Sequence, residues 1–396
     1  MPGKKKRADK RSGRKKTPAV FDFRQYEVES RMKLIHCSDL HLDSKMESNL
    51  TRELAKERKR ELILTFERMV DYAVEQGVQI ILIAGDLFDT TRIGKTAARL
   101  VEEQITGHPQ IDFLYLQGNH EHDNFLAALT QHPKNLKVFG REWTKYSYPL
   151  EEENKTITIT GVELTPENSR GIYDSLVLAQ DDVNIVMLHG QESQYDARDN
   201  AEIINIRALQ NKYIDYLALG HIHEYKYQKL DNRGNYCYSG CLEGRGFDEC
   251  GPKGFVLLNV EDGQGQHTFV PFAKRTLETV MVDISGCHTI GEISVHIEEA
   301  FKDISPDCLV QTVLTGEVDM DTDKDISYLA KKYADRFYFL KIYDKTRLAV
   351  NYADYRLDMS LKGEFIRLLE KADLPQEEKD AIILTGIRAL SGEEIE

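Results

Sequence analysis

The sequence lacks long apolar runs, paired cysteine motifs and a nucleotide-binding glycine loop. No apolar segment approaches the roughly 20 residues that a membrane-spanning helix needs, so we expect no membrane partner. The six cysteines are scattered without a CxxC pair, which predicts reduced thiols in an intracellular protein. No GxxxxGK[ST] segment occurs, so the chain itself is not expected to bind ATP. No apolar segment follows the basic N-terminus, so we expect no signal peptide and a cytoplasmic location.

Charge is unevenly distributed along the 396 residues. The formal net charge is -14, yet the opening stretch MPGKKKRADKRSGRKK is rich in lysine and arginine. Such a stretch predicts a disordered basic tail over residues 1–31. Two interpretations stay open: the tail holds nucleic acid through its phosphates, or it is a solvated extension before the folded chain begins near Met32. The acidic remainder excludes a simple basic-patch binder, so metal ions and local patches would have to attract nucleic acid.

Apolar runs of strand length alternate with helix-length segments in the first part of the chain. Segments 58–77 and 93–106 have apolar residues at helical spacing and separate the first three runs. This alternation predicts βαβ units followed by a second sheet, and therefore an α/β fold. The expected strands are 33–38, 78–85, 112–118, 156–164, 184–190 and 216–220.

Metal-capable residues follow nearly every one of these runs, in the segments SDLHLD, GDLFD, GNHEHD, LHG and GHIH. In open α/β sheets a site forms outside the carboxyl ends of the strands, so five strand ends can bring their ligands to one place. The expected ligands are Asp39, His41 and His223 for one metal, Asn119, His189 and His221 for a second, and Asp86 as a bridge.

The residue types indicate two divalent metals that act on a phosphoryl group. Imidazole and carboxylate ligands without thiolate suit Mn, Fe or Zn rather than Ca or Mg. Two such ions about 4 Å apart clamp the attacking and leaving oxygens, and they lower the pKa of bound water toward about 7. His120 can donate a hydrogen bond to the phosphoryl oxygen or protonate the leaving oxygen.

The order D-x-H, G-D-x-x-D, G-N-H-E, H, G-H-x-H resembles that of the calcineurin-like metallophosphoesterases, over residues 33 to about 255. The resemblance implies a four-layer α/β/β/α sandwich around two metals, the same seven ligands, and His120 as the catalytic histidine. The stretch YSGCLEGRGFDECGPKGF (238–255) extends the resemblance to the SbcD-type DNA repair nuclease subunits. That branch implies hydrolysis of DNA phosphodiester bonds, usually with manganese, and an SMC-like coiled-coil ATPase partner, often with dimerisation.

The same resemblance implies a nuclease domain over 32–275 and a smaller α+β capping domain with C-terminal helices over 276–396. The cap would help to hold DNA, and the terminal helices would either dock the ATPase coiled coil or form a lid on the cap. Arg245 and Lys253 are candidate DNA-phosphate contacts or solvated turn residues. Asp89 stands where archaeal and eukaryotic members often have a histidine tied to exonuclease action. The choice between exonuclease and endonuclease is therefore left open.

Two other functions remain compatible with these motifs. The first is a metallophosphoesterase for a small nucleotide or a phosphoprotein, against which the second domain and the 238–255 stretch weigh. The second is a non-catalytic scaffold for a partner ATPase, against which the intact ligand set weighs, because degenerate sites usually lose their ligands. Metal content after purification separates the scaffold from the enzyme.

Overall fold

The computed structural model describes most of the chain from residue 31 to residue 390. The basic tail expected over 1–31 lies outside the described residues except for Arg31. The described stretches are 31–46, 50–89, 93–118, 124–130, 132–150, 154–195, 202–261, 263–319, 322–349 and 352–390.

The first sheet has six strands in the order β14-β13-β1-β2-β3-β4. Strands β1 to β4 are parallel neighbours, whereas β13 runs antiparallel to β1 and forms a hairpin with β14. Strand β2 is apolar and buried along its whole length, as expected for a parallel strand that is covered on both faces. The bounds are β1 Arg31–Cys37, β2 Ile80–Ala84, β3 Asp112–Leu116, β4 Leu136–Val138, β13 Gly254–Glu261 and β14 Gln264–Pro271.

The second sheet also has six strands, in the order β11-β12-β10-β7-β6-β5. Its central strands β6, β7, β10 and β12 are parallel, and the two edge strands pair antiparallel with their neighbours. The bounds are β5 Thr144–Leu150, β6 Lys155–Gly161, β7 Val183–His189, β10 Tyr216–Gly220, β11 Lys226–Lys229 and β12 Asn235–Tyr238. A small ladder of β8 (Gln191–Ser193) and β9 (Ile203–Asn205) lies beside it.

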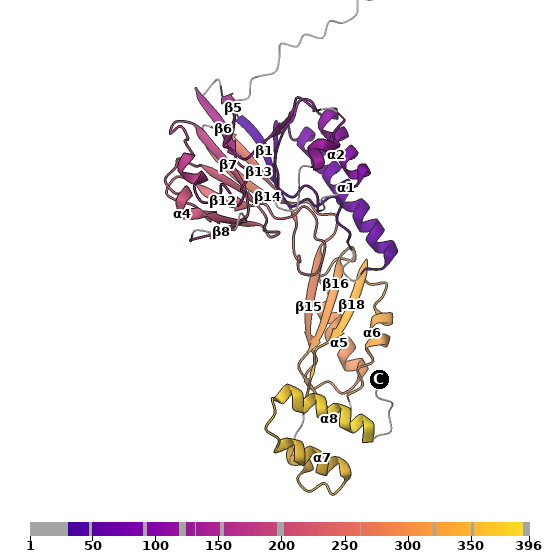
Figure 1. Ribbon diagram of the computed structural model, residues 1–396. Coiled ribbons are helices and arrows are strands. Elements are labelled where there is room, and N and C mark those ends of the chain that lie inside the picture. The colour runs from indigo at the N-terminus through magenta and orange to yellow at the C-terminus, as the bar shows by residue number, and fades with distance from the viewer. Residues whose placement is uncertain are drawn as a thin grey trace, which may run out of the picture.

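The two sheets pack face to face, with helices outside each of them (Figure 1). Along β2, Ile81 and Ile83 face the cluster with helices α1 and α2, while Ile80 and Leu82 face the second sheet, as strand alternation requires. Short helices α4 and η2 pack on the outer face of the second sheet. The expected α/β/β/α sandwich is therefore confirmed. The bounds are α1 Arg52–Glu75, α2 Lys95–Gly107, α3 Asn124–Ala128, η2 Ile172–Ser175 and α4 Ile206–Leu209.

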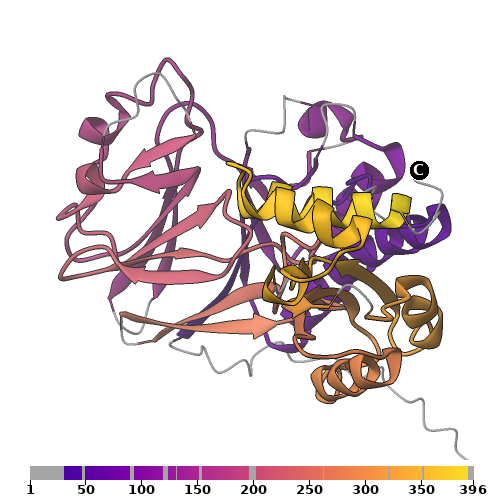
Figure 2. The same cartoon turned by 90° about the horizontal axis from the view of Figure 1, so that it is seen from below.

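After residue 276 the chain forms a three-stranded parallel sheet, β15-β16-β18, with an apolar core of its own. Figure 1 shows this part beside the lower end of α1, and Figure 2 shows it from below. Helices α7 and α8 follow and share a small separate cluster. The bounds are β15 Leu277–Asp283, α5 Ile290–Ala300, β16 Leu309–Thr315, β17 Glu317–Val318, α6 Ile326–Lys332, β18 Phe339–Asp344, β19 Arg347–Leu348, η3 Tyr352–Tyr355, α7 Leu361–Glu370 and α8 Gln376–Leu390.

A buried polar network joins α1 to both domains. The Arg58 guanidinium pairs with Glu61 and donates to Glu243 Oε2 at 3.1 Å. Arg275, in the link between the domains, donates to Glu61 Oε1 at 2.9 Å, and its guanidinium lies 3.4 Å from the ring centroid of Tyr338 in the second domain. The Arg58 and Glu243 side chains are 1% and 0% exposed, so their charges depend on each other rather than on water.

Within the described ranges, no helix combines the length and the apolar character required to cross a membrane.

Candidate metal centre

Parallel strands from both sheets end at one edge of the sandwich. Strands β1 and β2 are parallel neighbours in the first sheet, as are β7 and β10 in the second. Because the carboxyl ends of such strands meet at the same edge, the residues that follow them come together. The side chains delivered to this edge are Asp39 and His41 after β1, Asp86 after β2, His189 at the end of β7, and His221 and His223 after β10.

Four of these residues have a left-handed backbone. The φ angles are 52° at Asp39, 44° at His41, 51° at Asp86 and 98° at His221. Non-glycine residues adopt positive φ rarely and at a cost, and such residues cluster at functional sites. Hydrogen bonds from Asp39 N to Gly85 O at 3.1 Å and from His41 N to Asp86 O at 3.0 Å hold the two loops against each other.

The first group of potential ligands matches the set expected for one metal. One ligand atom each of Asp39, His41 and His223 lies within 4.8 Å of the others. The Nε2 atoms of the two histidines are 3.3 Å apart, and His223 Nε2 is 3.8 Å from Asp39 Oδ1. Both imidazoles thus point the same nitrogen at one place.

The second group contains Asp39, Asp86 and His189, again within 4.8 Å. Asp86 Oδ2 lies 3.4 Å from His189 Nε2 and 3.9 Å from His41 Nε2, so it faces both groups, as expected for a bridge. Asp39 also belongs to both groups, which the sequence did not predict. The His221 backbone amide donates to both Asp39 carboxylate oxygens, at 3.0 and 3.1 Å, and holds them in this position.

Three expected members of the site are not part of the two ligand groups of the described residues: His221, Asn119 and His120. The His221 ring lies beside that of His189, with centroids 5.5 Å apart, but it belongs to neither group. Asn119 and His120 lie outside the described residues. The ligand role of Asn119 and His221 and the catalytic role of His120 therefore stay predictions.

The electrostatics of the groups fit divalent cations. Burial lowers the pKa of His189, but the hydrogen bond that the imidazole donates to Asp86 and the charges of Asp86 and Asp39 outweigh it and raise the pKa to about 9. The buried carboxylates thus attract positive charge strongly. With imidazole nitrogens and carboxylate oxygens as the donors, the groups suit a transition metal or zinc.

Residues 32–225 match the calcineurin-like phosphoesterase family. The chain contains a calcineurin-like metallophosphoesterase domain. This family of hydrolases uses divalent metals, in agreement with the Asp/His groups at the strand ends.

Two curated relatives resemble the chain beyond this domain. The "Uncharacterized metallophosphoesterase YhaO" of Bacillus subtilis (strain 168) is 27% identical over 294 residues, which cover 71% of each chain. The "DNA double-strand break repair protein Mre11" of Methanopyrus kandleri is 24% identical over 252 residues, covering 60% of this chain and 52% of that protein. Among solved structures, a dimetal phosphatase from Danio rerio matches 60% of this chain and 99% of its own, with 9% identity and a TM-score of 0.39.

Three imidazoles of the metallophosphoesterase centre have a polar partner near Nδ1, the ring nitrogen opposite the one that faces the ligand groups. His189 Nδ1 lies 2.9 Å from Ala84 O, His41 Nδ1 lies 3.3 Å from Asp89 Oδ1, and His223 Nδ1 lies 2.7 Å from Glu249 Oε1. Such partners fix the ring orientation and turn Nε2 toward the other members of the ligand groups. The sequence analysis did not identify Glu249 as a partner of a ligand histidine, because in the sequence it is one acidic residue among several in a polar loop.

The carboxylates of Asp89 and Glu249, which face the Nδ1 atoms of His41 and His223, are held in their charged form. The hydrogen bond to His41 lowers the pKa of Asp89 to about 2, against the effect of burial and with a contribution from Arg245. Burial raises the pKa of Glu249, but His223 and Arg245 outweigh it and hold the pKa well below its usual range. Both carboxylates are thus charged at neutral pH. Glu249 lies at hydrogen-bond distance from His223 Nδ1, and Asp89 lies 3.3 Å from His41 Nδ1.

Lys253, an expected DNA contact, is engaged inside the protein. Its side chain is buried at 4% exposure, and Nζ donates to His223 O at 2.8 Å. Its contact with DNA stays a prediction. Arg245, the other expected contact, is also engaged inside the protein: its guanidinium contacts Glu249 and Asp89, and its side chain is 18% exposed. A basic residue in a polar loop usually lies on the surface. In this protein the 238–255 segment instead places Arg245 and Lys253 against the residues of the metallophosphoesterase centre.

Gly85→Ala is expected to weaken metal binding at the second group. A Cβ on Gly85 would lie 2.0 Å from His189 Nδ1, and the φ of +93° is one that alanine rarely adopts. Because the methyl group would displace the imidazole, we expect the affinity for Mn²⁺ to be lower by about tenfold or more. Isothermal titration calorimetry measures this affinity. Gly140→Ala is the matched control, because nothing lies within 4 Å of its Cβ. Equal affinities in the two variants would show that the ring tolerates the methyl group.

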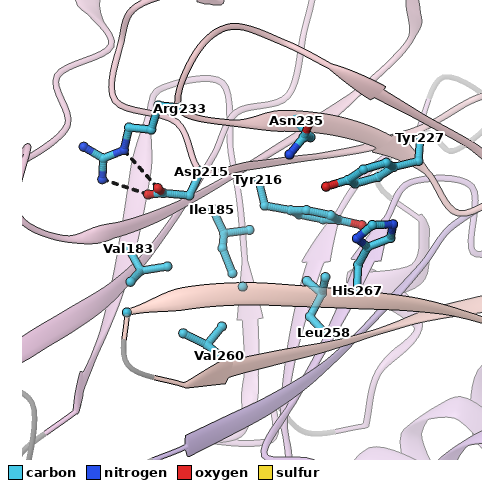
Figure 3. A pocket seen from close by; sticks show the side chains of 12 residues that line it. Val183, Ile185, Asp215, Tyr216, Tyr227, Arg233, Asn235, Leu258, Val260 and His267 are labelled. Atoms are coloured by element: carbon cyan, nitrogen blue, oxygen red, sulfur yellow. Dashed lines mark hydrogen bonds and ion pairs between the residues drawn. The ribbon is translucent and has the colours of Figure 1, made fainter.

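A cavity of about 370 Å³ lies at the other end of the sandwich, by the amino ends of β7, β10 and β12 (Figure 3). Its one guanidinium, that of Arg233, pairs with Asp215 at 2.9 Å and also donates to two backbone carbonyls. Tyr227 stacks on His267 along the opposite wall. None of the candidate metal ligands that the structure describes lines this cavity, so it is separate from the two ligand groups.

Proposed function

We propose that this protein is a two-metal phosphodiesterase that hydrolyses DNA, and that it is the nuclease subunit of a DNA repair assembly. The observation that carries the proposal is the pair of overlapping ligand groups, Asp39–His41–His223 and Asp39–Asp86–His189, at one edge of the sandwich. The separate domain after residue 276 supports a polymeric substrate, because a small nucleotide needs no second domain beside the centre.

The assignment of DNA rests on likeness. The Methanopyrus kandleri relative bears the name of a DNA double-strand break repair protein, and its match covers 60% of this chain. The Bacillus subtilis relative is named as a metallophosphoesterase without a substrate. We extend the proposal to manganese as the metal, an SMC-like ATPase as the partner and a homodimer as the assembly, all of which follow from the resemblance of the motifs.

In this proposal the residues of the chain orient the metals and move the proton. Bound divalent metals would lower the pKa of water to about 7 and offset the negative charge of the phosphoryl group. Asp39, His41 and His223 would hold the first metal, and Asp86 and His189, with Asn119 and His221, the second. His120 would donate a proton to the leaving oxygen. The 2.7 Å contact of Glu249 with His223 keeps one ligand in its tautomer.

The purified protein is expected to cut end-labelled double- or single-stranded DNA in the presence of Mn²⁺. It should also hydrolyse bis-p-nitrophenyl phosphate, and both activities should fall by about 10²- to 10⁴-fold in His120→Ala, as expected for the loss of a general acid. Turnover of the small diester without cleavage of DNA, also with a candidate ATPase partner present, would contradict the nuclease proposal and favour a small-molecule substrate. Protein that binds no metal would instead favour the scaffold.

A further inference from the structure

A charged bridge lies behind the first ligand group. His41 and His223 face each other through Nε2, and the opposite nitrogen of each ring faces a carboxylate, Asp89 for His41 and Glu249 for His223. The Arg245 guanidinium lies between those two carboxylates. Its Nη2 donates to Glu249 Oε1 at 2.9 Å, its Nε donates to the same oxygen at 3.2 Å, and its Nη1 donates to Asp89 Oδ1 at 3.3 Å.

The backbone of the 245–249 turn adds to this arrangement. The backbone N–H of Arg245 donates to Glu249 Oε2 at 2.7 Å, so that both carboxylate oxygens of Glu249 are occupied by the same residue. The Asp89 backbone N–H in turn donates to Asp43 Oδ1 at 2.6 Å. The Glu249 carboxylate and the Asp89 backbone are thus each held by a hydrogen bond, and the Arg245 guanidinium lies between the two carboxylates.

We propose that Arg245 is a positioning residue for the first metal. It acts on His41 through Asp89, and on His223 through Glu249 and through its own contact of 3.2 Å between Nη2 and His223 Nδ1. This proposal rests on the metal centre of the proposed function, and does not depend on DNA as the substrate. A planar guanidinium reaches two carboxylates in a fixed geometry, which a single ammonium does not. Without Arg245 the two carboxylates would repel each other and the nearby charges of Asp39 and Asp86, and would turn away from the imidazoles they orient.

This role differs from that of a residue that touches the substrate phosphate. A phosphate-binding arginine would set the KM for substrate and leave metal affinity unchanged. A positioning arginine sets the affinity of the metal in the absence of any substrate. The two roles are therefore distinguished by metal binding to the free protein.

The test is titration of the full-length, metal-free protein with Mn²⁺ by calorimetry, for wild type, Arg245→Met and Arg245→Lys. We expect Arg245→Met to weaken one of two Mn²⁺ sites by about tenfold to hundredfold and to leave the other within about threefold. Arg245→Lys is expected to recover only part of the loss, since it restores the charge but not the two-sided contact. Unchanged Mn²⁺ affinity together with a raised KM for bis-p-nitrophenyl phosphate would overturn the proposal in favour of a phosphate contact.

Arg233→Met is the matched control, because Arg233 pairs with Asp215 in a similar way at the far end of the sandwich (Figure 3). It should leave both Mn²⁺ sites unchanged. If Arg245→Met does not fold by circular dichroism, Asp89→Asn and Glu249→Gln test the same bridge from its two ends. Each should weaken the same single site, and no weakening in either would overturn the proposal. A wild type that binds two Mn²⁺ without cutting DNA would contradict the nuclease proposal alone.

Discussion

Asp86→Asn is expected to reduce hydrolysis of bis-p-nitrophenyl phosphate by about 10³-fold or more, because the lost charge stabilisation is worth several kcal/mol. Asp86 Oδ2 lies within 3.9 Å of His41 Nε2 and within 3.4 Å of His189 Nε2, so the loss of its charge affects both ligand groups. An asparagine keeps the shape of the side chain but cannot neutralise two cations. The measurements are initial rates with Mn²⁺ and the metal content of the purified variant.

Two measurements distinguish a loss of catalysis in Asp86→Asn from a loss of folded protein. Asp86 Oδ2 also lies 3.4 Å from His189 Nε2, so thermal unfolding of the metal-free variant with EDTA shows how much stability the loss of this pair costs, separately from the loss of metal. Asp215→Asn, which removes a paired carboxylate at the far end of the sandwich, should keep wild-type activity. Activity within tenfold of wild type in Asp86→Asn would exclude Asp86 as a bridging ligand.

Arg58→Met is expected to lower the free energy of unfolding by about 3–5 kcal/mol, because it removes one partner of a buried ionic network. The Glu243 side chain is fully buried and would lose its charge partner, retaining the hydrogen bond from Thr65 Oγ1 at 2.7 Å. Glu61 would keep only Arg275, at 2.9 Å. The effect is measured by urea unfolding monitored by circular dichroism, in which the midpoint urea concentration of the variant should be lower than that of the wild type.

Arg99→Met on helix α2 is the matched control for this loss. Arg99 also pairs with a glutamate, Glu103, at 2.7 Å, but their side chains are 79% and 57% exposed. Its removal should change the free energy of unfolding by no more than about 0.5 kcal/mol. Equal effects of the two substitutions would mean that the Arg58 network contributes no more than a surface ion pair.

The candidate ligands that the structure brings together were predictable because each stands at or just after the end of a strand. Asp39, Asp86 and His223 lie within three residues of the end of β1, β2 or β10, and parallel strands of a sheet end at one edge. Apolar runs such as IILIA mark those strands without any knowledge of the tertiary fold. Local sequence pattern and one rule of sheet topology thus suffice for most of the candidate centre.

The partners of these ligands were not predictable. Arg245 meets Asp89 across 156 residues, and no local pattern relates the two positions. Lys253 has a sequence environment typical of an exposed turn, yet the chain folds back so that its ammonium caps His223 O. Burial of a charged side chain depends on what is packed over it, which the sequence around it does not encode.

The β13–β14 hairpin is a second example. It pairs with β1 in register from Arg31 opposite Glu261 to His36 opposite Val256, and it extends the first sheet by two strands that the sequence analysis did not foresee. The helix α6 of the second domain was also not predicted. Both elements form contacts with segments far away in the chain, which decide between strand, helix and loop where local propensity is weak.

The sequence by itself determined the α/β class and indicated the kind of metal centre and most of its candidate ligands, because strand periodicity and strand ends are local properties of the chain. Only the tertiary structure decided that Asp39 belongs to both ligand groups, that Glu249 and Asp89 orient the histidines, and that Arg245 and Lys253 face inward. These features depend on distances between side chains that the fold brings together from widely separated segments, and on how much water the fold leaves around each charge.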